Sequence, residues 1–247
     1  MATSHRYLIV FVTVVTASLF ITSRADACSC VGTRPACQAF WDPGAVFSGK
    51  VLSIEPENRS EPRFGNRLVR FAVLEAFRGL STSEVTISTG SGGGDCGYAF
   101  VAGESYLVYA YQAQGAPSLS TGICGRTRPL SQADEDIAYM RSVPSIGALG
   151  ATVTGSVFDQ DRNIAVERGA TKLAPLGSAV VQLDCGGAMF RATTDEQGRF
   201  SIAGVPVGTC TATVDAGSPR VTYAPPISIS DPRSCAAVDL VVGTKRR

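Results

Sequence analysis

The cysteines are the residues in this sequence whose type and spacing could do chemistry. The chain has eight of them, and the first two, Cys28 and Cys30, stand two positions apart directly after an apolar leader. Cysteines can bind metal, act as nucleophiles or pair, and an even number in an exported chain is typical of disulfides. We therefore expect the following to be disulfide-bonded: Cys28, Cys30, Cys37, Cys96, Cys124, Cys185, Cys210 and Cys235.

The leader predicts export. Residues 7–21 form a nearly unbroken apolar run, and small residues at Ala25 and Ala27 mark a signal-peptide cleavage site. The run is shorter than the ~20 apolar residues that span a membrane. We expect cleavage after Ala27, no membrane span in the mature chain, and a secreted or periplasmic location. A lipoprotein would also begin at Cys28, but lipid-attachment sites favour Leu where Ala25 stands and a small residue where Asp26 stands, so simple cleavage is favoured.

Two groups of carboxylates are the remaining candidates for catalysis. The only histidine, His5, lies in the leader, so a mature chain has neither the commonest general base nor the commonest metal ligand. Paired carboxylates could replace it, but a solvated helix start and a turn explain both groups. We predict no enzyme, no cofactor and no metal in the free protein. The carboxylates are Asp134, Glu135 and Asp136 in a predicted helix and Asp195 with Glu196 in a predicted turn.

Two classes of binding protein are excluded. The formal net charge is +1 and falls to zero without the leader, whereas a nucleic-acid or anionic-lipid partner calls for a basic excess.

Residues 92–97 match the glycine spacing of a dinucleotide site, but such a site needs a helix next. Residues 96–112 are rich in Tyr and Val and are expected to continue as strand, so residues 90–94 are interpreted as a loop.

Short strands and two helices must position these residues in the first half. Val69, Phe71 and Val73 alternate onto one predicted face. A helix is expected within residues 35–42, and a second over residues 131–142, with Ser131 as its N-cap, acidic residues in its first turn and Arg141 in its last. The predicted strands are 45–54, 68–77, 84–89 and 104–112.

The second half has the pattern of a β-sandwich. Seven short strands are predicted in under 100 residues, with a longer loop at 160–176 after the first. Residues 195–198 are predicted to be a hairpin turn. Residues 143–151 contain Pro and Gly and no charge, and we place a linker there, between domains at 28–142 and 152–247, after the signal peptide at 1–27.

The first half resembles the netrin-like domain of the tissue inhibitors of metalloproteinases, in its bacterial single-domain form. The resemblance is carried by Cys28-Ser29-Cys30, "AFWDPGAVFSGKV", "CGYAFVAGESYLVYA" and "ICGRTRPLSQADEDIAYMR", which cover most of residues 28–142. It implies an OB-fold barrel with flanking helices and disulfides Cys28–Cys96 and Cys30–Cys124. Cys37 stands a few residues earlier than the third cysteine of that family.

The resemblance also implies an inhibitory mechanism. In that family the free α-amine and the carbonyl oxygen of the first residue, here Cys28, chelate the zinc of a protease. The disulfides at Cys28 and Cys30 would hold that amine rigidly, Ser29 would enter the neighbouring pocket, and the loop with Asp95 and Gly97 would form an adjacent ridge. No metal is implied in the free protein.

The second half resembles the carboxypeptidase regulatory-like, transthyretin-like sandwich. The motif is Thr194-Asp195-x-x-Gly198-x-Phe200 followed by Val205-Pro206-x-Gly208. In such a sandwich the strand ending at Cys185 lies antiparallel to the strand carrying Cys210, which favours that pair. Cys37 and Cys235 are then left over and could join the two domains, although counts do not determine pairing.

Two functions stay open at this point. One is a secreted, monomeric inhibitor whose partner is an extracellular zinc metalloprotease. The alternative is a non-inhibitory extracellular binding or adhesion module whose partner is a cell-envelope component, because two terminal disulfides would also seal an exposed barrel edge. The expected fold for both is all-β: an OB-fold barrel with flanking helices plus a seven-stranded β-sandwich.

Overall fold

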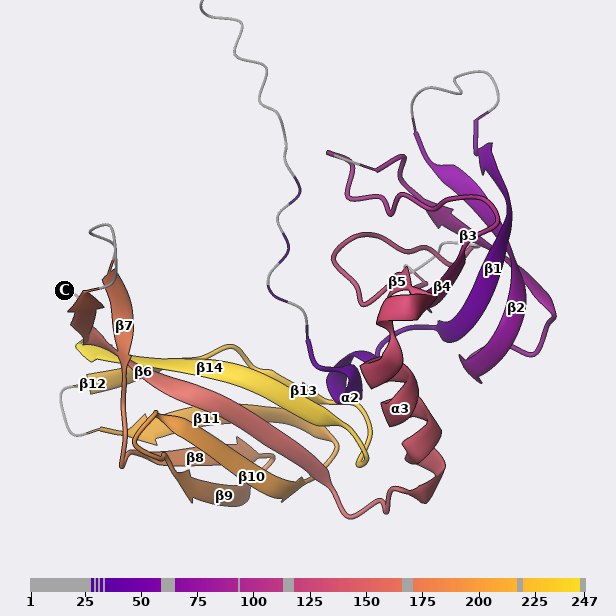
Figure 1. The fold of residues 1–247 in the computed structure, drawn as a ribbon. Coiled ribbons are helices and arrows are strands. Elements are labelled where there is room, and N and C mark those ends of the chain that lie inside the picture. The colour runs from indigo at the N-terminus through magenta and orange to yellow at the C-terminus, as the bar shows by residue number, and fades with distance from the viewer. Residues whose placement is uncertain are drawn as a thin grey trace, which may run out of the picture.

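The computed structural model describes residues 28, 30, 32, 34–58, 65–92, 94–112, 118–165, 171–216 and 220–244. The expected signal peptide, residues 1–27, and Ser29 lie outside these described residues. Within them the protein is all-β, as expected: strands form three sheets, and the helices are few and short (Figure 1). No helix of the described part has the length and hydropathy needed to cross a membrane.

The first half of the chain forms a five-stranded antiparallel sheet in the order β3-β2-β1-β4-β5. Strand β1 is central, and its pairing with β2 shifts register at three places, which bends and twists the pair. The strands are β1 (Ala45–Pro56), β2 (Arg67–Arg78), β3 (Glu84–Thr89), β4 (Ser105–Ala110) and β5 (Arg128–Pro129).

Aromatic rings fill the inner side of this sheet. Phe47 and Phe71 are fully buried and pack edge to face at 5.6 Å between ring centroids. Phe100 packs on Phe71 at 5.1 Å. Val69 is buried in the same cluster, and the partly buried Val73 packs against it, so the alternating face predicted for β2 is confirmed.

Residues 96–104 are not a strand, contrary to expectation. Cys96 and Gly103 have φ values of 60° and 84°, and a left-handed residue at each end interrupts a β ladder. The segment instead turns its aromatic side chains, Tyr98 and Phe100, into the core of the first half. Strand β4 begins only at Ser105.

The two predicted helices are present, one of them with a different start. Helix α2 covers Ala36–Ala39 and helix α3 covers Asp134–Ser142. Ser131 is not the N-cap of α3: it lies in the 3-10 turn η1 (Leu130–Gln132), which closes with the N–H of Ala133 donating to Leu130. The N-cap of the α-helix therefore lies two residues later than expected, at Ala133, and makes no side-chain cap.

The second half packs two sheets face to face. One has the order β10-β6-β14-β12, with β7 beside β6, and the other has the order β13-β11-β8-β9. Strand β14 pairs in parallel with β6. The strands are β6 (Ala151–Ala165), β7 (Thr171–Pro175), β8 (Val180–Cys185), β9 (Ala188–Thr193), β10 (Arg199–Val205), β11 (Gly208–Asp215), β12 (Arg220–Tyr223), β13 (Ile227–Ile229) and β14 (Cys235–Thr244).

Two of these strands, β7 and β12, were not expected. The loop predicted at 160–176 is wrong, because β6 continues to Ala165 and pairs with β7. The polar run that suggested a loop is accommodated as a register shift between Asp159 and Asn163. Strand β12 adds to the edge of β14. The predicted turn at 195–198 is confirmed: Gly198 has a φ of 75° and donates to the carbonyl of Asp195.

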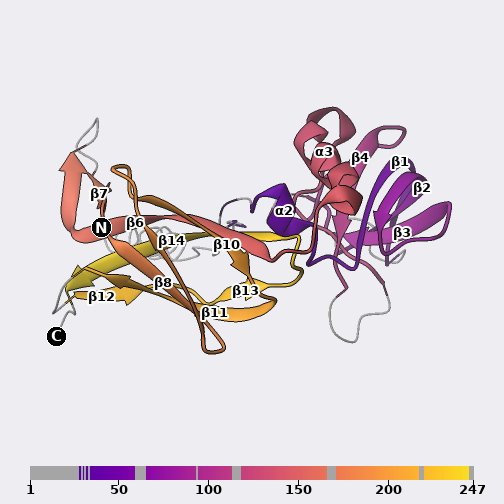
Figure 2. The same ribbon diagram turned by 90° about the horizontal axis from the view of Figure 1, so that it is seen from below.

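The two halves meet at helix α2, which lies between helix α3 and strand β14 in both views (Figures 1 and 2). The segment predicted as a linker, 143–151, begins with the 3-10 turn η2 (Val143–Ser145). Val143 is buried in one hydrophobic cluster with residues of α2 and α3, and β6 already starts at Ala151. The chain thus leaves the first core and enters the second within a few residues.

Candidate functional site

Disulfides hold the first described residues against the first sheet. Cys28 pairs with Cys96 and Cys30 with Cys124, with Cα–Cα distances of 5.4 and 5.1 Å. These are the two pairs that the resemblance of the first half implies. They hold positions 28 and 30 on two loops that are 28 residues apart in the chain. Ser29, the residue expected to enter a protease pocket, lies outside the described residues.

The two cysteine-bearing loops are joined to each other. The N–H of Ile123 donates to the carbonyl oxygen of Cys96 at 2.9 Å. The hydroxyl of Thr89 donates to the carbonyl oxygen of Thr121 at 2.9 Å and accepts the N–H of Tyr98 at 2.8 Å, so β3 holds both loops. The two loops to which Cys28 and Cys30 are bound therefore form one continuous surface.

Asp95 organises the turn that carries Cys96. Its carboxylate accepts the hydroxyl of Ser91 at 2.7 Å and the backbone N–H groups of Ser91, Gly92 and Gly97 at 2.6, 3.1 and 3.0 Å. These hydrogen bonds, that of the Ser91 hydroxyl first, lower the pKa of Asp95 to about 2. Gly97 packs so closely on Gly90 that a side chain at position 97 would overlap its backbone. The structure thus brings Asp95 and Gly97 beside Cys28 through Cys96.

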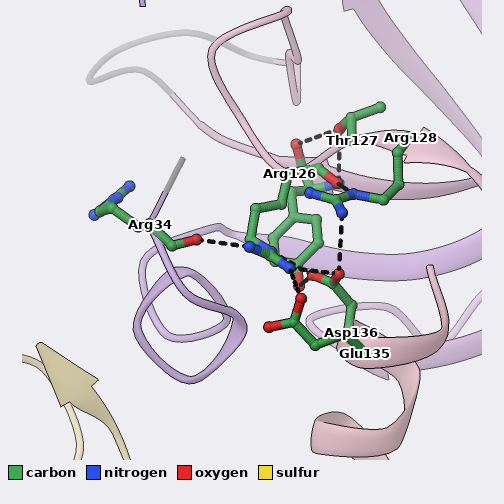
Figure 3. A network of polar contacts seen from close by, with 7 residues as sticks. Arg34, Arg126, Thr127, Arg128, Glu135 and Asp136 are labelled. Carbon is green, nitrogen blue, oxygen red and sulfur yellow. Dashed lines mark hydrogen bonds and ion pairs between the residues drawn. The ribbon is translucent and has the colours of Figure 1, made fainter. Parts of the chain in front are cut away.

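A buried ion pair extends this surface toward helix α3 (Figure 3). Arg126 donates from Nε to Asp136 Oδ1 at 2.6 Å and from Nη2 to Asp136 Oδ2 at 2.7 Å. Its third nitrogen, Nη1, donates to the backbone carbonyl of Arg34 at 2.8 Å. Because Arg126 follows Cys124 by two residues and Arg34 follows Cys30 by four, the N-terminal segment is held twice on the same short loop.

The sequence predicted that Asp136 is a solvated carboxylate at the start of a helix. That prediction is wrong. Its side chain is fully buried, and the hydroxyl of Tyr109 also donates to it at 2.6 Å. Burial alone would raise the pKa of Asp136, but the hydrogen bonds from Arg126 and Tyr109 and the charges of Arg126 and Arg128 outweigh burial and lower it. Asp136 holds Arg126 in place.

The other candidate carboxylates form no joint site. Glu135 keeps a side chain that is 70% exposed and makes one ion pair, to Arg126, while Asp134 is exposed. Asp195 closes its own turn by accepting the N–H groups of Gln197 and Arg199. Among the described residues no three His, Cys, Asp or Glu side chains are grouped so as to hold a metal ion.

Of the remaining disulfides, one lies within the second half and the other links it to the first half. Cys185 pairs with Cys210 between β8 and β11, which run antiparallel as expected. Cys37 in α2 pairs with Cys235 at the start of β14, so the pairing left open by the sequence joins the two halves. Neither Arg34 nor Arg126 was a candidate in the sequence analysis; the position of Arg126, two residues after Cys124, is the one feature of the sequence that places it near the site.

We call the described residues Cys28, Cys30, Gly32 and Arg34 the tethered segment. A cleft of about 620 Å³ lies between the halves, beside this segment. The segment contributes Gly32 and Arg34 to its lining, the first half contributes Tyr111, and β14 contributes Asp239. No family model matches this chain, and a search of the curated proteins found no match.

Proposed function

We propose that the mature protein is exported, begins at Cys28 and inhibits a zinc metalloendopeptidase through its N-terminus. The observation that carries this proposal is the double attachment of the first residues. Cys28 and Cys30 are each covalently bound to a loop of the first domain, and Arg126 holds the carbonyl of Arg34 just beyond them. Such a terminus is ordered before it meets a partner.

The chemistry suits an N-terminal amine rather than a thiol. The sulfur of Cys28 is used in a disulfide, which leaves the α-amine and the carbonyl oxygen of this residue as neighbouring ligands. A catalytic zinc keeps one coordination position open, and an α-amine with a pKa of ~7.7–8 supplies the neutral donor near neutral pH. A terminus that is already rigid avoids most of the ordering cost of binding.

The surroundings supply a contact surface for the rim of the protease. Asp95 and Gly97 flank Cys96, the disulfide partner of Cys28. Ile123, which is 41% exposed, precedes Cys124 and donates its backbone N–H to the carbonyl oxygen of Cys96. In this proposal Ser29 enters the pocket beside the zinc. The bent central strand β1 supports the OB-type barrel that the same resemblance implies.

The test compares four forms of the protein against a panel of zinc endopeptidases: mature protein, protein with one Ala before Cys28, protein with one Ala after Arg247, and Ser29→Arg. The N-terminal Ala converts the amine of Cys28 into an amide and leaves the disulfides in place. Inhibition should fall by more than about a hundredfold, because a lost metal bond is worth several times the ~1.4 kcal/mol that corresponds to tenfold. The C-terminal Ala should change nothing, and Ser29→Arg should change which proteases are inhibited.

A non-inhibitory extracellular binding module is the alternative, and the interdomain cleft favours it, because a cleft lined by both halves offers a binding site that needs no free N-terminus. If no form inhibits any protease of a broad panel, this alternative replaces the inhibitor. If the form with Ala before Cys28 inhibits as well as the mature protein, chelation is wrong even though inhibition is real.

A further inference from the structure

Helix α2, which directly follows the tethered segment, and Asp42 just after it are bound to the second domain by one disulfide and two hydrogen bonds. Cys37 forms its disulfide with Cys235. The side-chain oxygen of Gln38 accepts the backbone N–H of Ala237 at 3.2 Å. Just past the helix, the hydroxyl of Ser230 donates to Asp42 at 3.1 Å. We call this contact region, together with Trp41 and Arg233, the α2 interface.

Trp41 supplies the aromatic ring of the α2 interface. The guanidinium carbon of Arg233 lies 4.6 Å from the centroid of the Trp41 ring, close enough for a cation–π contact. The indole N–H of Trp41 donates to the hydroxyl of Tyr139 at 2.9 Å, and that hydroxyl donates to the carbonyl of Arg233 at 3.1 Å. One aromatic residue from each of two first-domain segments thus contacts the same residue of the second domain.

The side chain of Arg233 is held in position by Asp231, independently of its contact with Trp41. Its side chain donates twice to Asp231, from Nε at 2.9 Å and from Nη2 at 3.0 Å, and its backbone N–H donates to the same carboxylate at 2.8 Å. The guanidinium therefore has a fixed orientation. A fixed cation adds more to an aromatic contact than a mobile one, because less side-chain freedom is lost.

Helix α2 needs such support. It has four residues and no side-chain cap, and a single turn of helix is not stable by itself because nucleation is unfavourable. On one side Phe40 packs edge to face on Tyr139 of α3, at 6.0 Å. On the other side the support comes from the second domain.

We propose that Arg233 and the Cys37–Cys235 disulfide position the N-terminal site, so that the second domain serves to hold α2 and the segment before it. Arg233 is a positioning residue that acts through Trp41, and it touches no partner itself. The claim about local order stands on the contacts above. The claim that this order matters for inhibition rests on the proposed function.

The test uses full-length mature protein with Arg233→Ala, Arg233→Lys and the control Arg199→Ala. Arg199 is a matched control because it also pairs with an Asp of its own turn, Asp195, at 2.8 Å, and the hydrogen bonds and ion pairs found for its side chain among the described residues stay within that turn. Three quantities are measured: fluorescence of Trp41, the only tryptophan; amide hydrogen exchange at Gln38, Ala39 and Phe40; and inhibition of the most sensitive protease.

Arg233→Ala should change the Trp41 emission and speed exchange at these three amides by at least about threefold, the effect expected for losing one cation–π contact. Inhibition should weaken in parallel, with little change in the melting temperature. Arg233→Lys, which keeps a cation over the ring, should restore exchange and inhibition, and Arg199→Ala should leave all three quantities unchanged.

Two results would overturn the proposal: exchange at α2 that is the same in Arg233→Ala and in the unchanged protein, or an equal effect of Arg199→Ala, which would indicate general destabilisation. The proposed function fails separately. If no protease is inhibited but exchange rises in Arg233→Ala and recovers in Arg233→Lys, the second domain still positions the segment, and only its inhibitory use is wrong.

Discussion

Arg126 uses all three nitrogens of its guanidinium on partners of its own chain. Two donate to the buried carboxylate of Asp136, and the third donates to the carbonyl of Arg34. Through Arg126, helix α3 therefore holds the backbone of the N-terminal segment in place at Arg34. A buried charge that loses its partner is costly, so this pair is more important for the order of the segment than the exposed ion pairs of the molecule.

The change Asp136→Asn tests this role, because it keeps the shape and removes the charge. We expect a loss of about 3–5 kcal/mol in the free energy of unfolding, measured by denaturant titration at neutral pH. The control Glu135→Gln, at the exposed partner of the same arginine, should cost less than about 1 kcal/mol. Equal costs for the two changes would contradict the account.

The same pair predicts a pH dependence. The pKa of Asp136 is lowered in the folded protein, so its contribution to stability is present above the unfolded value of about 3.9 and is lost as the pH falls through the folded pKa. The stability difference between the unchanged protein and Asp136→Asn should therefore be constant near neutral pH and shrink below about pH 4. A difference that grows on acidification would show that the carboxylate is not stabilised by its charge.

Asp95 gives a prediction that needs no stability measurement. Its pKa of about 2 arises first from the Ser91 hydroxyl, so Ser91→Ala should raise the pKa of Asp95 toward the ordinary value of about 3.9. Carbon NMR of the carboxyl group reports both values directly. If Ser91→Ala leaves the titration of Asp95 unchanged, the turn described here is not the one in solution.

At the scale of elements, the turn between β3 and β4 depends on close approach of two backbones. Gly97→Ala would place a methyl group into the backbone of Gly90 and displace the loop that carries Cys96. We expect a cost of about 1–3 kcal/mol in unfolding free energy, the range for overpacking. Gly32→Ala, in the tethered segment, meets nothing within 4 Å and should cost little; the reverse order of the two costs would contradict the structure.

Elements with a clear hydrophobic periodicity could be predicted from the sequence. Elements that depend on which strands pair could not. The alternation of Val69 and Phe71 identified β2 and its buried face, and the acidic first turn identified α3. Residues 96–104 share the aromatic composition of a strand, but their left-handed ends exclude one. Strand β7 was missed because its pairing with β6 crosses a polar bulge, which no local pattern reveals.

At the scale of the whole molecule, the two halves of the chain have separate sheets and core clusters, and helix α2 with the Cys37–Cys235 disulfide links them. The sequence predicted an all-β protein in two parts and offered Cys37 with Cys235 as a link between them. It could not predict the buried pair of Arg126 with Asp136 or the contact of Arg233 with Trp41. Both bring together residues whose types are common on protein surfaces, and only the fold makes them neighbours.

The central claim is that the amine of Cys28, held by its own disulfide and by that of Cys30, binds the zinc of a protease. Its most direct test is the visible spectrum of the target protease with cobalt in place of zinc, since cobalt bands respond to the ligands of the metal. Saturating mature protein should shift these bands, and the form with Ala before Cys28 should not. An unchanged spectrum at concentrations that fully inhibit the protease would contradict the claim.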